Sequence, residues 1–119
     1  MEKVNINEKL NTFSEYWSPK IVGDINESHI KLVKLKGEFM WHLHVNEDEM
    51  FMVIKGNLVI KLRTKDIVLK EGEFFIIPRG IEHMPVAEEE VHVMLVEPKT
   101  TLNTGNVKNE RTVEVLEKI

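Results

Sequence analysis

The chain has 119 residues and a mass of 13.9 kDa, a length that suits one hydrophobic core, so we expect one domain spanning residues 1–119. Its hydrophobic (42%) and charged (30%) fractions are those of a globular protein and exclude a disordered chain. The 16 Lys and Arg residues are scattered among 20 acidic residues, the net charge is −4, and no basic stripe exists, so nucleic-acid binding is not expected.

Two further absences narrow the class of protein. The chain contains no cysteine, which excludes disulfides and thiolate metal sites and leaves only nitrogen and oxygen ligands for any metal ion. No apolar run has the length of a signal-peptide core or of a membrane span. We therefore expect a cytoplasmic protein without a membrane partner.

The first part of the chain predicts one short helix followed by an arm. Ile6, Leu10 and Phe13 have the spacing of one helical face and follow asparagines that can cap a helix, so residues 5–13 are predicted to be helical. Residues 16–24 contain Ser18-Pro19 and Gly23-Asp24, which predict extended chain with a sharp change of direction and little regular structure.

From residue 28 the pattern changes to short runs rich in Val, Ile, Leu and Phe. Turn sequences separate these runs at roughly ten-residue spacing, which is typical of an antiparallel sandwich or barrel. The fold class is therefore predicted to be all-β. The run 91–96 predicts a last buried strand, residues 100–109 a loop, and residues 113–116 a terminal strand or helix.

A group of metal-ligand residue types lies in the middle of the chain. His42 and His44 are two residues apart, so their side chains share a face if this segment is a strand. After the turn at residues 46–48 the chain returns, and Glu49 is expected on the partner strand beside them. Each such group costs about 1–3 kcal/mol when buried without a partner, a cost that a bound cation would remove. His83, after a Pro-x-Gly turn, is a weak signal by itself.

The spacing of these residues resembles the two motifs of the cupin family. The first motif is His-x-His, then four residues, Glu, six residues and Gly. It matches His42, His44, Glu49 and Gly56. The second motif is Gly, then five residues, Pro-x-Gly, two residues and His. It matches Gly72, Pro78, Gly80 and His83. The motif region covers residues 37–87. It departs from the usual pattern at Gly37, which lies one residue too close to His42, and at Ala87, where Asn is frequent; neither is a ligand position.

The resemblance implies a small single-domain cupin with a jelly-roll barrel (a double-stranded β-helix) over about residues 28–98, preceded by the short helix and arm. It also implies a homodimer and one divalent transition metal ion inside the barrel, held by His42, His44, Glu49 and His83. Three nitrogens and one oxygen suit Mn, Fe, Ni, Zn or Cu and leave one or two positions open. The alternative is a metal-free cavity in which the four residues form a polar network. No organic cofactor is expected.

The alternation of side chains along a strand also predicts which residues near these ligands point into the barrel and which point outward. Met40, Phe51 and Val53 share their parity and are predicted to wall the cavity, whereas His92 is predicted to point outward because Val91, Val93 and Leu95 form the apolar face of its strand. The residues of opposite parity are predicted to pack under the arm, in a dimer interface or within the chain: Trp41, Met50, Met52 and Ile54. Arg79 and Glu82 are interpreted as solvated turn residues.

The resemblance leaves the reaction open because cupins serve many functions. One hypothesis is a metal-dependent enzyme, isomerase-like or dioxygenase-like, that acts on a small molecule. The alternative is a non-catalytic module that binds or senses a small molecule. Few acid–base groups are expected on the inward faces, so no catalytic residue is assigned, and no Arg/Lys cluster indicates a phosphate pocket.

Overall fold

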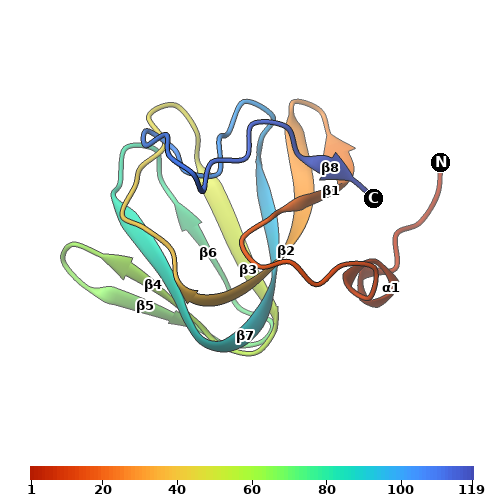
Figure 1. Cartoon of the computed structure of the whole chain (residues 1–119), viewed down its shortest axis with the longest axis horizontal. Helices are drawn as coiled ribbons and strands as arrows, with labels where there is room; N and C mark the ends of the chain where they lie inside the picture. Colours follow the sequence, from red (N-terminus) through yellow and green to blue (C-terminus); the bar gives the residue numbers. More distant parts are fainter.

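The computed structural model describes residues 1–119, and its main feature is a set of eight strands rolled into a barrel (Figure 1). The helix is α1 (Ile6–Leu10), and the strands are β1 (Lys20–Ile25), β2 (Ser28–Glu38), β3 (Glu49–Lys55), β4 (Leu58–Leu62), β5 (Asp66–Leu69), β6 (Phe74–Ile77), β7 (His83–Pro98) and β8 (Glu117–Lys118). The predicted all-β class and the short N-terminal helix are confirmed. No helix in the structure has the length and apolarity needed to cross a membrane.

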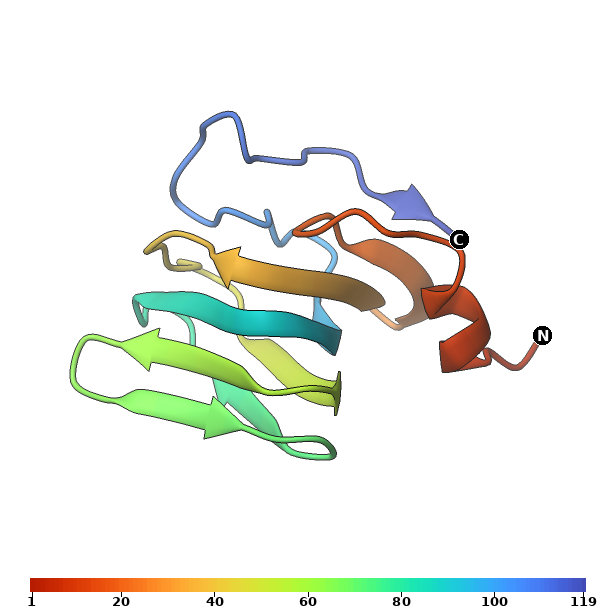
Figure 2. The ribbon, with the colours of Figure 1, turned by 60° about the horizontal axis from the view of Figure 1, so that its bottom comes forward.

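The barrel closes through two long strands that contribute to both of its layers. Strand order is β5-β4-β7-β2-β1-β8, and β3 lies between β7 and β6. The first part of β7, His83–Val86, pairs with β4, whereas residues 92–96 pair with β3; β2 follows β7 along most of its length. A register shift in β2 between Leu35 and Gly37 allows this pair to bend. Figure 2 shows β4 and β5 in front of β3 and β6.

The core lies inside the barrel and consists of every second residue of its strands. Burial alternates in β3 and along β7 from Val91 onward, as the period of two in a half-buried strand requires. Twelve buried hydrophobic residues form one cluster: Val33, Leu35, Phe51, Val53, Leu58, Ile60, Leu69, Ile77, Ala87, Val91, Val93 and Leu95. His92 has the opposite parity, and its Nε2 lies 2.6 Å from the Glu90 carboxylate. The predicted outward position of His92 is confirmed.

The N-terminal region contains more regular structure than the sequence predicts. Asn5 caps α1 by accepting a hydrogen bond from the Glu8 N–H (3.0 Å), and Leu10 and Phe13 pack on Leu32 outside the barrel. The expectation of an arm with little regular structure is wrong for residues 20–25, which form β1 and pair with β2. Gly23 lies at a register shift within β1, and the turn comes later, at residues 26–27.

The sheet therefore begins before the expected residue 28. It also continues past residue 98, because β8 pairs with β1 in parallel. β8 depends on a partner that is distant in the sequence, so local turn propensities cannot locate it, whereas β1 forms a hairpin with the adjacent β2.

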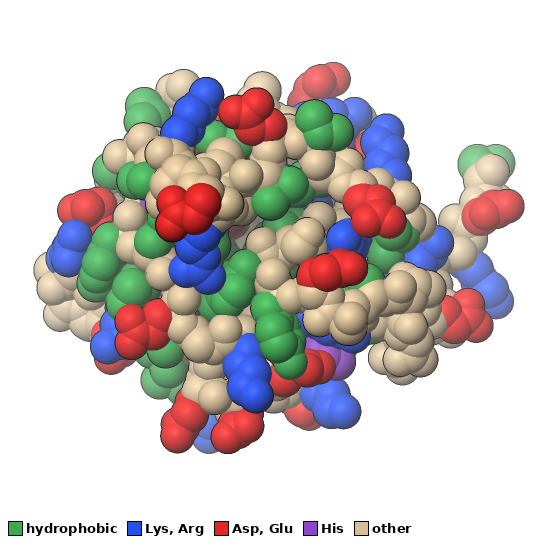
Figure 3. Space-filling view, in the orientation of Figure 1, with side chains coloured by type: hydrophobic (Ala, Val, Ile, Leu, Met, Phe, Trp, Pro, Cys, Tyr) green, Lys and Arg blue, Asp and Glu red, His purple; other side chains and the backbone are tan.

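The outer face of the barrel is partly covered by the chain itself. Ile54 and Met94 pack against the cluster under α1, and the Arg63 guanidinium lies 3.7 Å from the centre of the Trp41 ring. On β6, Phe74 is 59% exposed and Ile76 51% exposed. Acidic and basic side chains are interspersed on the face shown in Figure 3, which carries no continuous basic surface.

Candidate metal centre

The four residues of the motifs meet inside one end of the barrel. One potential ligand atom from each of His42, His44, Glu49 and His83 lies within 4.8 Å of the others, and none of the four residues is more than 5% exposed. Glu49 and His83 are the first residues of β3 and β7, and the two other histidines lie on the connection between β2 and β3. This arrangement forms a cluster that can hold a metal ion.

The route by which these residues meet differs from the predicted one. Residues 39–48 form no regular strand; their backbone makes a single bridge, in which His42 and His83 exchange two N–H to C=O hydrogen bonds of 3.1 and 2.9 Å. Glu49 begins a strand that pairs with β6 and β7 and not with the histidine segment. The expected hairpin is therefore wrong. Closure of the barrel, and not pairing with a neighbouring strand, brings Glu49 to the histidines.

Backbone carbonyls fix the orientation of two of the rings. The Nδ1 atom of His42 lies 2.9 Å from the Met40 carbonyl oxygen, and Nδ1 of His83 lies 2.9 Å from the Ile81 carbonyl oxygen. A carbonyl only accepts, so each Nδ1 carries the proton and each Nε2 keeps a free electron pair. Burial, together with the neighbouring His83, lowers the pKa of His42 to about 4. His42 is therefore neutral at pH 7, the form that binds metals.

Unpaired polar atoms in the cluster match the requirements of a metal ion. Both ring nitrogens of His44, Oε1 of Glu49 and Nε2 of His83 are buried without a hydrogen-bond partner. Oε1 of Glu49 lies 3.4 Å from the Nε2 atoms of His44 and His83. Ligand atoms at about 2.0–2.2 Å from one ion lie at most about 4.4 Å apart, so the four atoms, which lie within 4.8 Å of one another, need to move closer together around an ion. The residues present therefore fit a divalent ion.

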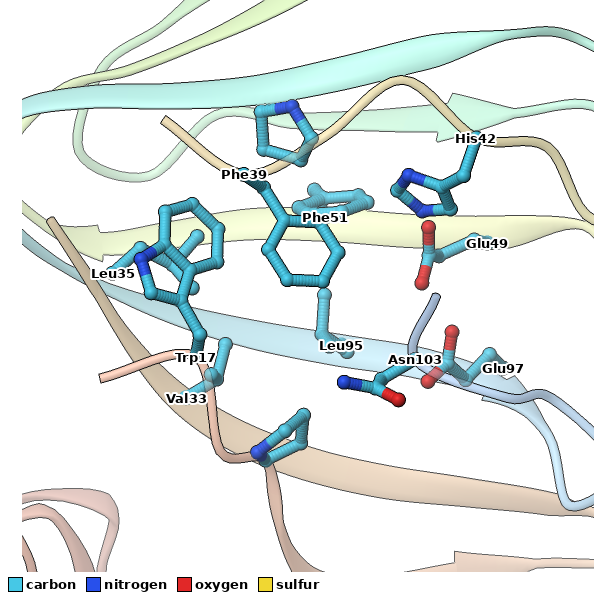
Figure 4. Close-up of a pocket in the computed structure, with 12 residues that line it drawn as sticks. Trp17, Val33, Leu35, Phe39, His42, Glu49, Phe51, Leu95, Glu97 and Asn103 are labelled. Atoms are coloured by element: carbon cyan, nitrogen blue, oxygen red, sulfur yellow. The ribbon is translucent and has the colours of Figure 1, made fainter. Parts of the chain in front are cut away.

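A second buried carboxyl group, which the sequence reasoning missed, faces Glu49 (Figure 4). The Lys31 ammonium lies 2.7 Å from Oε1 of Glu97, and both side chains are 2% exposed. Burial and the neighbouring Glu49 raise the pKa of Glu97 well above its usual range, although Lys31 opposes the shift. Burial would also raise the pKa of Glu49, but its close neighbours Glu97, His44 and His83 outweigh burial and hold that pKa well below its usual range. Glu97 is therefore the carboxyl group of the pair that more readily keeps a proton, and Glu49 is the one that more readily ionises.

The alternation of side chains along β7 and β2 indicates that both members of this pair point into the barrel. Glu97 shares the inward parity of Val93 and Leu95 on β7, and Lys31 shares that of Val33 on β2. The prediction that the inward faces carry few acid–base groups is corrected by this carboxyl group.

A cavity opens beside the cluster. Apolar side chains line one side of it and polar groups the other (Figure 4). Its lining comprises Trp17, Pro19, Val33, Leu35, Phe39, His42, Glu49, Phe51, Pro85, Leu95, Glu97 and Asn103. Of the three predicted wall residues only Phe51 lines the cavity; Val53 belongs to the closed core, and the Met40 sulfur lies 3.5 Å from the Asn109 amide.

Comparison with known proteins gives one family and several relatives. Residues 31–113, more than half of the chain, match the family described as "Cupin domain". A cupin-2 domain protein of Shewanella frigidimarina has a TM-score of 0.80 and 44% identity, with 81% of this chain and 94% of that chain covered. Protein NMB1881 of Neisseria meningitidis has a TM-score of 0.76 and 27% identity, with 82% of this chain and 100% of that chain covered.

Curated relatives match over shorter stretches. The uncharacterized protein YdbB of Bacillus subtilis is 35% identical over 63 residues, which cover 52% of this chain and 56% of that protein. A 3-hydroxyanthranilate 3,4-dioxygenase of Xenopus tropicalis is 28% identical over 90 residues, 69% of this chain and 32% of the dioxygenase. The chain thus spans about half of the first relative and about a third of the second.

Proposed function

The chain belongs to the cupin domain family, and from that premise we propose that it is a metal-dependent enzyme acting on a small molecule, with one divalent ion held by His42, His44, Glu49 and His83. The proposal depends mainly on one observation: several buried nitrogen and oxygen atoms of the cluster have no hydrogen-bond partner in the protein. Bound there, a transition metal ion would supply Lewis-acid or oxygen-activating chemistry to a substrate at its open positions.

The cavity defines the shape of the molecule that this site accepts. The walls formed by Leu35, Phe51 and Leu95 favour an apolar or aromatic body, whereas the polar groups at the other end place its oxygen-bearing head beside the cluster. Trp17 and Phe39 stack with ring centres 4.8 Å apart and form an aromatic part of the wall.

Two polar side chains of the cavity have definable roles. The amide of Asn103 is fixed, because it donates to the Arg111 carbonyl (2.9 Å) and accepts from the Val113 N–H (2.8 Å). Glu97 is the carboxyl group beside the ligands that is not itself in the metal cluster, so it is placed to exchange a proton with a substrate head. Among the two predicted reaction classes, the similarity to 3-hydroxyanthranilate 3,4-dioxygenases supports the dioxygenase-like one.

Oxygen uptake by the iron-loaded protein tests this proposal. With hydroxylated aromatic acids and diketones as candidate substrates, we expect oxygen consumption equal to substrate loss, and no conversion under anaerobic conditions. The His83→Ala variant is the control and should consume no oxygen. Conversion of the substrate without oxygen would contradict the dioxygenase proposal and indicate an isomerase. Binding that stabilises the protein against heat but yields no product would favour the non-catalytic binding module.

Phosphorylated sugars are expected not to bind. No Arg or Lys side chain lines the cavity, so a phosphate dianion would lie beside two carboxyl groups with no cationic side chain in the lining to pair with it. We expect no shift of the unfolding temperature with millimolar hexose phosphates, measured by calorimetry with the unphosphorylated sugars as control. A clear stabilisation by the phosphates alone would contradict this assignment of the cavity.

A further inference from the structure

Residues 101–113, here called the C-terminal strap, cross the end of the barrel that contains the cluster, beside the ligand segment, residues 38–44 (Figure 1). The strap contains no strand, yet Thr104 in it is fully buried. Oγ1 of Thr104 lies 2.6 Å from Oγ1 of Thr112, and the Asn103 amide forms hydrogen bonds with the backbone of Arg111 and Val113. The strap therefore has a defined shape of its own.

The strap supplies backbone hydrogen bonds that the ligand segment does not obtain from the sheet. The Asn106 N–H donates to the Leu43 carbonyl (3.0 Å), and the Asn106 Oδ1 accepts from the Leu43 N–H (3.0 Å). Leu43 lies between His42 and His44, so one strap residue holds both backbone polar groups between the two histidines. Arg111 also donates to the Phe39 carbonyl (3.0 Å) at the beginning of the segment.

Gly105 allows this close approach. Its φ is +58°, and a Cβ added there would overlap the Leu43 carbonyl oxygen and lie 3.1 Å from Cδ2 of His42. The overlap involves backbone, so any larger residue must move either the strap or the ligand segment.

We propose that Gly105 and Asn106 are positioning residues for the metal centre: through Leu43 they set the places of the His42 and His44 rings. The proposal rests on the metal site of the proposed function. Ligands on irregular backbone need outside support to keep the geometry of a metal site, and the loss of such support reduces metal affinity about 10–100-fold. Neither strap residue belongs to the metal cluster or to the lining of the cavity described above.

Gly105→Ala and Gly72→Ala form a matched pair for the first test. Both glycines have positive φ (+58° and +82°), so both variants carry backbone strain, but a Cβ at Gly72 meets nothing within 4 Å. We expect Gly105→Ala to weaken Co²⁺ binding about 10–100-fold and to change the visible spectrum of the bound ion. Gly72→Ala should bind Co²⁺ as the wild type does. Equal affinities and spectra for the two variants would overturn the proposal.

Substitutions of Asn106 test the same claim without backbone strain. Asp keeps the oxygen that accepts from the Leu43 N–H, whereas Leu removes it. In the metal-free protein we expect Asn106→Leu to speed hydrogen exchange at the Leu43 amide about tenfold or more, and Asn106→Asp to keep its protection. The Leu variant should also bind Co²⁺ more weakly, and the Asp variant should restore binding. Wild-type protection of Leu43 in Asn106→Leu would overturn the proposal.

These measurements separate the two proposals. A wild-type protein that takes up no Co²⁺ would overturn the metal centre and its positioning together, whereas normal uptake with an unaffected Gly105→Ala variant would overturn only the role of the strap.

Discussion

Replacing His83 by Ala is expected to reduce the metal content of the purified protein from about one ion per chain to a trace. The His83 side chain is fully buried, its ring is fixed by the Ile81 carbonyl, and its Nε2 points at the cluster without another partner. Loss of one of four ligands leaves fewer atoms to bind the ion, and the effect should exceed the roughly 10–100-fold loss of affinity that is typical when a residue supporting a ligand is replaced. Elemental analysis of protein purified without chelators measures the result.

His92 provides the matched control on the same strand. It belongs to β7 like His83 but has the outward parity, with a side chain that is 16% exposed and paired with Glu90. His92→Ala should therefore retain the wild-type metal content, and His42→Ala should lose it as His83→Ala does. If the wild type and both cluster variants carry the same substoichiometric trace of metal, the proposed metal centre is wrong.

Replacing Lys31 by Met is expected to destabilise the metal-free protein by about 3–5 kcal/mol. The buried Lys31 ammonium compensates the negative charge of the Glu49–Glu97 pair, in which the pKa of Glu49 is lowered and that of Glu97 is raised. Removal of Lys31 leaves that negative charge in the barrel without a counter-charge. Urea unfolding in the presence of a chelator measures the free energy of unfolding.

Two further variants show whether charge compensation is the cause. Arg79 pairs with Asp48 on the surface at 3.4 Å, with both side chains at least half exposed, so Arg79→Ala should cost less than about 1 kcal/mol. A double variant, Lys31→Met with Glu49→Gln, has no net buried charge and should recover at least half of the loss. A cost below about 1 kcal/mol for Lys31→Met, or no recovery in the double variant, would contradict this account.

The sequence predicts the barrel and the candidate ligands for local reasons. Alternation of side chains is a property of each strand alone, so Val91, Val93 and Leu95 are identified as inward residues without knowledge of any partner. The same alternation would have placed Glu97 inside, but a charged residue at the end of an apolar run is more often exposed. The segment of His42 and His44 was expected to be a strand because its spacing fits one; in the structure it makes only one bridge.

The sequence by itself determined which residue types are available for the site and which faces of the strands they occupy, because both follow from local chemistry and from the two-residue period of a strand. Only the tertiary structure decided which of these residues meet. Lys31 and Glu97 are 66 residues apart, and Leu43 and Asn106 are 63 residues apart. Such contacts depend on how the whole barrel closes and packs, and no local pattern near either partner encodes that choice.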